Sequence, residues 1–263
     1  MNSATIPDTE TKLEPIQAVQ RAMQVLECIS QAGSMSLADL HKSIKVNKAS
    51  LLRLTHTLTE CGYLKKDAAS GLYSITIKMF EVGTASIKSI DKFSVINTIL
   101  ADLSDATGRI AQFSIEDNNE LICLQSIGQK TDSFSVYTNV GKRSPLYCTS
   151  AGKALLASYS NADVMEKWNY FNIKQLTEHT ITDVQSLLAD LQETRNRQYA
   201  LDMEENEYHV FCVGSAVLGS DGKPIGSISI SGRTLTPEEE EDISKKLLNA
   251  VKLLSGMMGY IAF

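Results

Sequence analysis

The first third of the chain shows three short amphipathic patterns followed by two β-prone runs. Apolar residues at helical spacing predict a first helix that begins near Ile16 and ends at Gly33. The apolar stripe of this helix consists of Val19, Met23, Leu26 and Ile29. A Ser-x-x-Asp sequence at Ser36 has the form of a capping box, and it predicts a second short helix that contains Leu40 and Ile44.

A third helix is predicted between Asn47, which can cap its start, and Gly62, which can end it. Its apolar stripe is Leu51, Leu54, Leu58 and Cys61, and its polar side carries Lys48, Ser50, Arg53, His56, Thr57 and Glu60. A polar helix face that can donate hydrogen bonds is suited to the base edges of the DNA major groove. The pattern therefore predicts a recognition helix.

Residues 63–66 and 72–75 are β-prone, and a turn containing Gly71 separates them, so they predict a β-hairpin. Lys65 and Lys66 in this hairpin would contact phosphates, while the preceding helix reads the bases. Three helices and a hairpin wing in this order indicate DNA binding. A small helical bundle with ordinary solvated charges is the alternative reading of the same pattern.

Charge is distributed unevenly over the 263 residues, whose formal net charge is −6. Residues 1–90 hold 10 Lys and Arg against 8 Asp and Glu, whereas residues 91–263 hold 15 against 23. Between residues 40 and 66 six basic side chains face one acid, Glu60. The basic region thus coincides with the predicted DNA-binding module.

Composition excludes several other classes of protein. Residues 1–15 are polar and lack the features of a secretion signal, so we expect a flexible leader on a cytoplasmic protein. No apolar run approaches the roughly 18 residues of a membrane span, and we expect no membrane partner. The five cysteines are scattered and odd in number, which favours reduced thiols over disulfides or a zinc site.

The rest of the chain alternates helices and strands. Residues 78–90 predict a linker helix and residues 94–106 another helix. Strands are predicted at 110–115, 121–127, 134–138, 199–202, 210–218 and 225–231, and helices at 151–158, 163–169 and 184–195. Thr236 and Pro237, followed by four glutamates, predict the start of a last helix that runs to Met258. Together these elements predict an α/β sheet covered by helices.

No set of catalytic residues is evident. Lys153 follows a glycine, but Tyr147 stands where a phosphate-binding loop needs its first glycine and Ala154 where it needs Ser or Thr. The four histidines lack metal-ligand spacing, and residues 226–232 alternate like a strand and do not form a nucleophile elbow. We therefore predict neither an enzyme nor a metal or cofactor.

Three serines, Ser227, Ser229 and Ser231, share one face of a predicted strand, and Ile228 and Ile230 share the other. If the isoleucines face a core, the hydroxyls line a cavity on the opposite side. The strand could equally be an edge strand whose serines face solvent. The pattern alone leaves both interpretations open.

Four N-terminal segments resemble the IclR family of bacterial transcription regulators. They are residues 18–22 (AVQRA), 47–54 (NKASLLRL), 61–64 (CGYL) and 73–78 (YSITIK). The resemblance extends over nearly the whole chain. Asn47 and Ala49 stand where the family usually has Ser, and Asn caps a helix as well as Ser does.

The resemblance implies an α+β protein of two domains. It places a winged helix-turn-helix at residues 16–77, a linker helix used in dimerisation at residues 78–90, and a GAF-like effector-binding domain at residues 91–263. It also implies a site for a small organic anion formed by Ser150, Ala151, Asp202, Cys212, Ser229 and Ser231. Backbone N–H groups of Ser150 and Ala151 would hold a carboxylate, and Asp202 a ligand hydroxyl.

The surroundings of the implied site depart from the family at Tyr208-His209 and at Ala216, so the identity of the ligand cannot be taken from relatives. For Cys212 a buried strand thiol without a ligand role is the alternative. A nucleophilic role lacks a partner base in the sequence.

These features predict a regulator, more specifically a repressor, of a catabolic operon. It would bind a palindromic operator as a dimer or tetramer, and its effector would shift the population of conformations. One rival interpretation is an enzyme acting on a small carboxylic acid through Cys212 or Asp202, with an accessory winged helix. Another is an adaptor whose winged helix binds protein.

Overall fold

The computed structural model describes residues 15–87, 93–128 and 140–261. The chain divides into two compact units, Met1–Asp91 and Lys92–Phe263. The predicted strand at 134–138, nearly all of the predicted leader and the last residues of the predicted linker helix lie outside the described residues.

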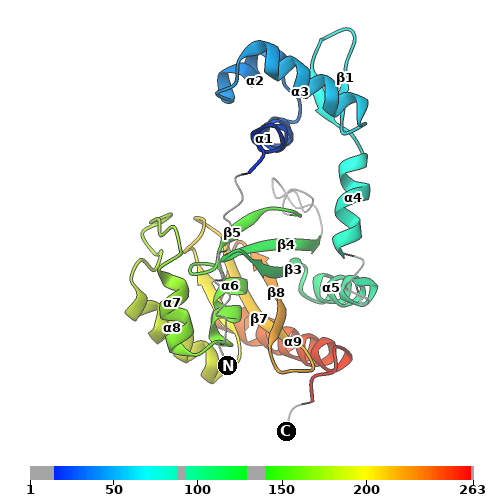
Figure 1. The fold of residues 1–263 in the computed structure, drawn as a ribbon. Helices are drawn as coiled ribbons and strands as arrows, with labels where there is room; N and C mark the ends of the chain where they lie inside the picture. The colour runs from blue at the N-terminus through cyan, green and yellow to red at the C-terminus, as the bar shows by residue number, and fades with distance from the viewer. Residues whose placement is uncertain (1–14, 88–92, 129–139, 262–263) are drawn as a thin grey trace, which may run out of the picture. The chain divides into compact units, whose positions relative to one another are not determined.

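The N-terminal unit has the predicted order of three helices, a hairpin and a further helix (Figure 1). Its elements are α1 Gln17–Ala32, α2 Leu37–Ser43, α3 Lys48–Glu60, β1 Leu64–Lys66, β2 Tyr73–Ile75 and α4 Lys78–Ile87. Leu26, Ile29, Leu40, Leu51 and Tyr73, among others, form its core. Backbone hydrogen bonds between Met35 and Tyr73 attach the hairpin to the segment between α1 and α2.

The prediction of the apolar stripe of α1 was only half right. Leu26 and Ile29 are buried as expected, and Val25 is buried with them. Val19 and Met23 are exposed, because the core-facing side of α1 lies about a quarter turn away, along Ala22, Val25 and Leu26. The exposed apolar side chains therefore form a separate face of α1.

The buried side of α3 also differs from the predicted stripe. Leu51 and Leu58 are buried, but Cys61 is exposed and Thr55 takes a place in the interior. The Thr55 hydroxyl donates to the carbonyl oxygens of Leu51 and Leu52, both at 3.1 Å. Because its hydroxyl is satisfied inside the helix, Thr55 can be buried at little cost.

The C-terminal unit contains one antiparallel sheet with the strand order β5-β4-β3-β8-β7-β6. The strands are β3 Ile110–Asp117, β4 Glu120–Ile127, β5 Arg143–Pro145, β6 Ala200–Met203, β7 Phe211–Leu218 and β8 Pro224–Gly232. Strand β5 was not predicted, because three residues that include a proline carry no alternating pattern. Strand β8 lies between β3 and β7, so the edge-strand interpretation of its serines is wrong.

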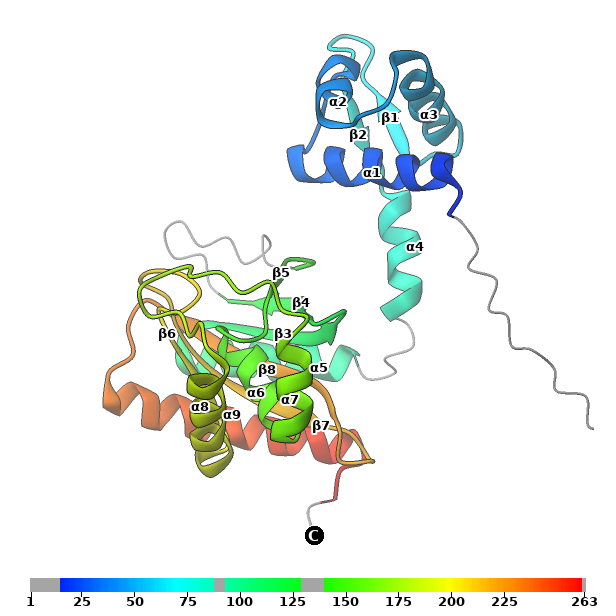
Figure 2. The same cartoon turned by 60° about the vertical axis from the view of Figure 1, so that its left-hand side comes forward.

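Helices cover both faces of this sheet (Figures 1 and 2). They are α5 Phe93–Thr107, α6 Ser150–Ala157, α7 Asn161–Trp168, α8 Val184–Arg197 and α9 Pro237–Met257. Helices α6, α7 and α8 lie on one face, and α5 and α9 lie on the other. Thr236 and Glu239 form the predicted capping box at the start of α9.

A buried ion network ties α6 to α8 and to the turn after β6. Lys153 on α6 is 1% exposed, and its ammonium donates to the Glu205 carboxylate. The same ammonium lies 3.0 Å from the Asp190 carboxylate on α8, and Arg197 lies 3.7 Å from Asp190. Lys153, which the incomplete phosphate-loop motif contains, thus has its acidic partners, Glu205 and Asp190, within the protein.

Removal of this ammonium should destabilise the C-terminal unit strongly. In Lys153→Ala the buried carboxylate of Glu205 loses its counter-charge, and breaking a buried pair in this way costs about 3–5 kcal/mol. Urea denaturation should show this loss of unfolding free energy. Lys246→Ala removes a surface pair with Asp242 and an exposed hydrogen bond to the Ala106 carbonyl, and it should cost only about 1 kcal/mol. Equal losses of unfolding free energy in Lys153→Ala and Lys246→Ala would contradict the assignment of Lys153 to a buried ion network.

Candidate functional site

The predicted DNA-contacting residues of α3 lie at its surface. Lys48, Arg53, His56 and Thr57 are exposed, and Ser50 is half-buried. The Asn47 side chain caps the helix, as predicted, by accepting a hydrogen bond of 2.8 Å from the Ser50 N–H. The Thr57 hydroxyl donates to the Arg53 carbonyl at 2.9 Å, so Thr57 can offer a ligand only its acceptor lone pairs.

Leu52 is a surface residue of α3 that the sequence analysis missed. It is 51% exposed, and it lies one turn from both Lys48 and His56 on the same side of the helix. An exposed leucine among donors can contact a thymine methyl group. The sequence analysis placed Leu52 neither in the apolar stripe of this helix nor on its polar side, because the polar side was assigned from polar residues alone.

The two lysines of the hairpin, Lys65 and Lys66, differ in the contacts that their side chains make. Lys65 is exposed and lies opposite Ser74, whereas the Lys66 ammonium lies 5.4 Å from the centre of the Tyr73 ring. Asp67 closes the turn by accepting hydrogen bonds from the Ser70 hydroxyl and N–H, which lower the pKa of its carboxyl. Lys65 is therefore the freer of the two cations.

Three consecutive carbonyls at the end of α3 are held by residues at the start of α4. The Lys78 ammonium donates to the Cys61 carbonyl at 2.7 Å, and the Thr76 hydroxyl donates to the Gly62 carbonyl at 2.5 Å. The Thr76 N–H donates to the Tyr63 carbonyl at 3.0 Å. A cation at a helix C-terminus is also favoured by the helix dipole. The orientation of α4 is thereby fixed relative to α3.

A cavity of about 90 Å³ lies in the C-terminal unit beside the start of α6. All six residues of the implied effector site line it: Ser150, Ala151, Asp202, Cys212, Ser229 and Ser231. The structure also adds polar residues that the sequence analysis missed. Gln112 and Ser114 alternate on β3 as the serines do on β8, and that alternation within an apolar strand was the available signal.

Strand register explains why residues distant in sequence meet in this cavity. Asp202 on β6 pairs with Cys212 on β7, and Cys212 pairs with Ser231 on β8. Directly opposed residues project from the same face, so the three side chains form a row across the sheet. The Cys212 thiol donates to the Ser231 hydroxyl at 3.2 Å.

The start of α6 lies very close to β7. A Cβ atom at Gly214 would lie 2.6 Å from the Ser150 carbonyl carbon, so only glycine permits this approach. Thr149 caps the helix: its hydroxyl accepts from the Gly152 N–H at 3.2 Å and donates to the Pro145 carbonyl at 2.8 Å. The first N–H groups of a helix have no partner within the helix, so this end is suited to an anion.

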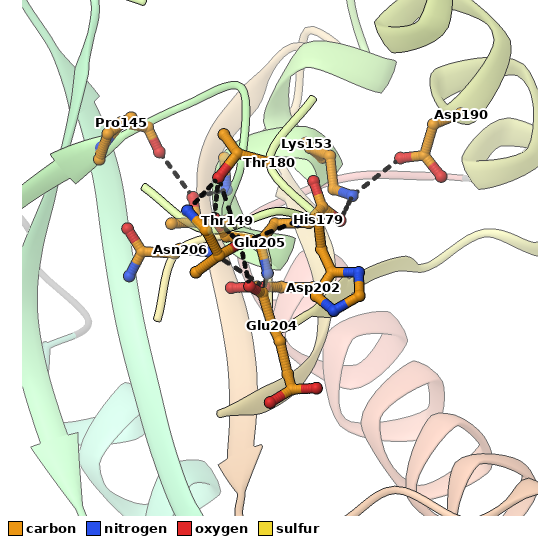
Figure 3. Close-up of polar contacts among 12 residues, drawn as sticks. Pro145, Thr149, Lys153, His179, Thr180, Asp190, Asp202, Glu204, Glu205 and Asn206 are labelled. Atoms are coloured by element: carbon orange, nitrogen blue, oxygen red, sulfur yellow. Dashed lines mark hydrogen bonds and ion pairs between the residues drawn. The ribbon is translucent and has the colours of Figure 1, made fainter. Parts of the chain in front are cut away.

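Asp202 is the buried one of the two acidic residues that line the cavity, the other being the exposed Glu207; Figure 3 shows its polar contacts. It is 2% exposed, and its Oδ1 accepts hydrogen bonds from the N–H groups of Glu205 at 2.8 Å and Asn206 at 3.4 Å. Burial and the nearby charge of Glu205 raise the pKa of Asp202 to about 7. The carboxyl can therefore gain or lose a proton near neutral pH, unlike an exposed aspartate.

The cysteines of the cavity are poor nucleophiles. Burial raises the pKa of the Cys212 thiol far above its usual range, and it raises the pKa of Cys123 to about 11. The thiolate is the reactive form of cysteine, so these thiols stay protonated and inert. This chemistry is unfavourable to the rival interpretation of an enzyme that uses Cys212.

The residues described by the structure contain neither a metal-binding cluster nor a membrane-spanning helix. Within them, no group of three or more His, Cys, Asp and Glu side chains is placed to hold a metal ion. None of the helices in the described ranges combines the length and the apolar character that crossing a membrane requires.

Comparison with known proteins gives matches to both units. The model of the bacterial transcriptional regulator IclR C-terminal family matches residues 84–256, and that of the IclR helix-turn-helix domain matches residues 18–68. The chain is 27% identical over 255 residues to the HTH-type transcriptional regulator KdgR of Escherichia coli K12, covering 96% of this chain and 97% of that protein. It is 30% identical over 250 residues to XynR of the same strain, covering 94% and 99%.

Solved structures agree with these matches. The IclR protein of Thermotoga maritima superposes with a TM-score of 0.77 at 25% identity, covering 92% of this chain and 98% of that one. A regulator from Rhodococcus sp. RHA1 has the same fold, with a TM-score of 0.81 at 22% identity and coverage of 93% and 98%. The named relatives are transcription regulators and not enzymes. The chain belongs to the IclR family of DNA-binding transcription regulators.

Proposed function

We propose that this regulator represses a catabolic operon and that a small carboxylate in the cavity beside α6 controls its binding to the operator. The observation that carries the proposal is the convergence of six separate residues on one polar cavity in the unit that lacks the winged helix. Two relatives in Escherichia coli, YiaJ and AllR, are named as transcriptional repressors, which supports the direction of control.

In this proposal the DNA-binding domain comprises residues 16–77. Arg53, near the centre of the exposed side of α3, reads base edges together with Lys48, Ser50, His56 and Thr57. Lys65 and Lys66 on the hairpin bind phosphates and set the register of the domain on the duplex. Leu52 adds an apolar contact to the same helix face.

The proposed dimer is supported by apolar side chains left uncovered in the N-terminal unit. Ile16 is 70% exposed, and Val19 and Met23 lie on the same side of the first helix. Ile77 and Phe80, at and near the start of α4, are 71% and 66% exposed. Large apolar side chains that a structure leaves exposed on one side of a helix are typical of an interaction surface. A second copy of the chain would cover them and supply the paired recognition helices that a palindrome requires.

The cavity limits the class of effector. At about 90 Å³ it lies well below the roughly 300–1,000 Å³ of pockets for drug-sized ligands, so a ligand of few heavy atoms fits. The start of α6 supplies N–H groups to a carboxylate, and Ser229, Ser231 and Cys212 supply hydroxyl and thiol donors to other oxygens. A short keto or hydroxy acid meets these requirements.

Control of DNA binding follows from differential affinity. An effector that binds one arrangement of the effector domain (residues 91–263) better shifts the population toward it. The linker helix, residues 78–90, transmits the change, because Thr76 and Lys78 hold its start against the end of α3. The spacing of the two recognition helices then changes, and operator affinity falls.

Substitution of Arg53 should weaken and broaden DNA recognition. Arg53→Ala removes proposed base contacts worth about 1–3 kcal/mol, so operator affinity should fall about 5- to 150-fold and discrimination against altered half-sites should shrink. Fluorescence anisotropy with an operator selected from random DNA measures both effects. Lys245→Ala, an exposed cation on α9, serves as the control and should bind normally. Wild-type affinity and selectivity in Arg53→Ala would exclude α3 as the recognition helix.

Substitution of Lys65 should act on affinity without changing sequence preference. Lys65→Ala removes one proposed phosphate contact, so binding should weaken to a similar extent on all sequences. The slope of log affinity against log salt concentration should decrease in magnitude by about one, because one fewer phosphate is neutralised. An unchanged salt slope would show that Lys65 does not lie on the DNA backbone.

The cavity can be tested through the serines of β8. Ser229→Ala with Ser231→Ala should leave operator binding intact and reduce ligand binding, because two hydroxyl donors are removed. Thermal shift with a panel that includes pyruvate and lactate measures the reduction, since a ligand of the folded state raises Tm. Ser227→Ala is the matched control on the same strand, because the buried Ser227 hydroxyl has no hydrogen-bond partner among the described residues. Equal ligand-induced increases in Tm in the unmodified protein, the double variant and Ser227→Ala would show that Ser229 and Ser231 do not bind the ligand.

A further inference from the structure

We propose that the effector cavity takes up a proton at Asp202 when it binds a small carboxylate, so that effector affinity falls as the pH rises above neutrality. The inference rests on the proposed function of the cavity, and it adds a mode of regulation to it. Its basis is the way in which charges are arranged around Asp202 (Figure 3).

Acids outnumber bases in the group of charges beside this carboxyl, in which Lys153, Glu205 and Asp202 are buried and Asp190 and Arg197 are partly exposed. Lys153 is shared between Glu205 and Asp190, and Arg197 lies within 3.7 Å of Asp190. These two cations face three acids once Asp202 is included. Solvent reaches Asp190 and Arg197, which form a pair of their own, so the buried part consists of one cation, Lys153, and two acids, Glu205 and Asp202. This buried part is electrically neutral only when one of its two acids holds a proton. A buried charge without a partner is costly, so protonation is the favoured way to remove it.

Asp202 is the acid placed to hold that proton. No cation in the described part of the chain lies within 4.0 Å of its carboxylate, whereas Glu205 and Asp190 both contact Lys153. Two N–H groups donate to Oδ1 of Asp202, which leaves Oδ2 to carry the hydrogen. The raised pKa of Asp202, about 7, agrees with this assignment.

Other titratable groups face Asp202 from the neighbouring elements. Cys212 on β7 and Cys148 before α6 are thiols whose pKa values are raised by burial, so both stay neutral. Lys142 and Glu207 also line the cavity; both are exposed and opposite in charge. Neither side chain supplies a buried counter-charge to Asp202.

A bound carboxylate makes the proton necessary. Ligand and Asp202 would share a cavity of about 90 Å³, where two like charges repel each other strongly. A protonated Asp202 instead donates a hydrogen bond to the ligand, in addition to the N–H groups at the start of α6. Below pH 7 the proton is already present. Above pH 7 it must be taken up from solution, which weakens binding up to tenfold for each pH unit.

Isothermal titration calorimetry of the full-length protein tests this directly. Pyruvate is titrated at pH 6 and pH 8 in two buffers of different ionisation enthalpy, with lactate as a second probe. We expect uptake of nearly one proton per site at pH 8 and little at pH 6, with affinity about tenfold lower at pH 8. This measurement on the unmodified protein needs no variant.

Asp202→Asn keeps the shape and the acceptor of the side chain and adds a permanent N–H donor. It should bind the same probe with equal affinity at pH 6 and pH 8 and without proton uptake. Asp105→Asn, which changes an exposed carboxylate on α5 that does not line the cavity, should retain the wild-type proton uptake. Ligand binding by the unmodified protein that is independent of pH, with no proton uptake, would overturn the inference while leaving the effector site in place. Binding of neither probe at either pH would overturn the proposed site itself.

Discussion

The close approach of α6 to the sheet is the constraint on which the effector unit depends. Gly214 allows the first residues of α6 to lie against β7, at a distance that any side chain there would prevent. The approach brings helix N–H groups over a face of the sheet that carries hydroxyls, a thiol and a carboxyl. On the next turn of the helix, Lys153 is anchored to α8 and to the turn after β6. The cavity exists because these contacts hold the helix in place.

In the N-terminal unit, both ends of α3 are held by hydrogen bonds, while the polar face of this helix remains exposed. Asn47 caps the start of α3, and Thr76 and Lys78 occupy three carbonyls at its end. Since Lys78 is the first residue of α4, a rotation of the linker helix must act on α3. Contacts at the two ends leave the exposed side chains of α3 available for DNA.

Much of this architecture could be predicted from local sequence. Capping residues, glycines and apolar periodicity located the helices and the hairpin, and alternation placed Ser229 and Ser231 on one face. Register between strands could not be predicted, because the pairing of Asp202, Cys212 and Ser231 joins segments far apart in the chain. The family resemblance supplied that grouping. Burial of Thr55 and exposure of Leu52 were missed because hydrophobic patterning sorts residues by polarity alone. Thr55 can be buried because its hydroxyl is satisfied within the helix, and Leu52 is an apolar residue that is 51% exposed.

In the proposed mechanism, ligand binding in the cavity and operator binding by the N-terminal unit are coupled, so each changes the affinity of the other. Linkage requires the coupling to be reciprocal, so the factor by which a ligand weakens operator binding must equal the factor by which the operator weakens ligand binding. The direct measurement is a pair of titrations on the full-length protein, with DNA at several pyruvate concentrations and with pyruvate in the presence and absence of DNA. Equal factors, both greater than one, are the predicted result. Pyruvate binding in the cavity that the operator does not change would contradict the account.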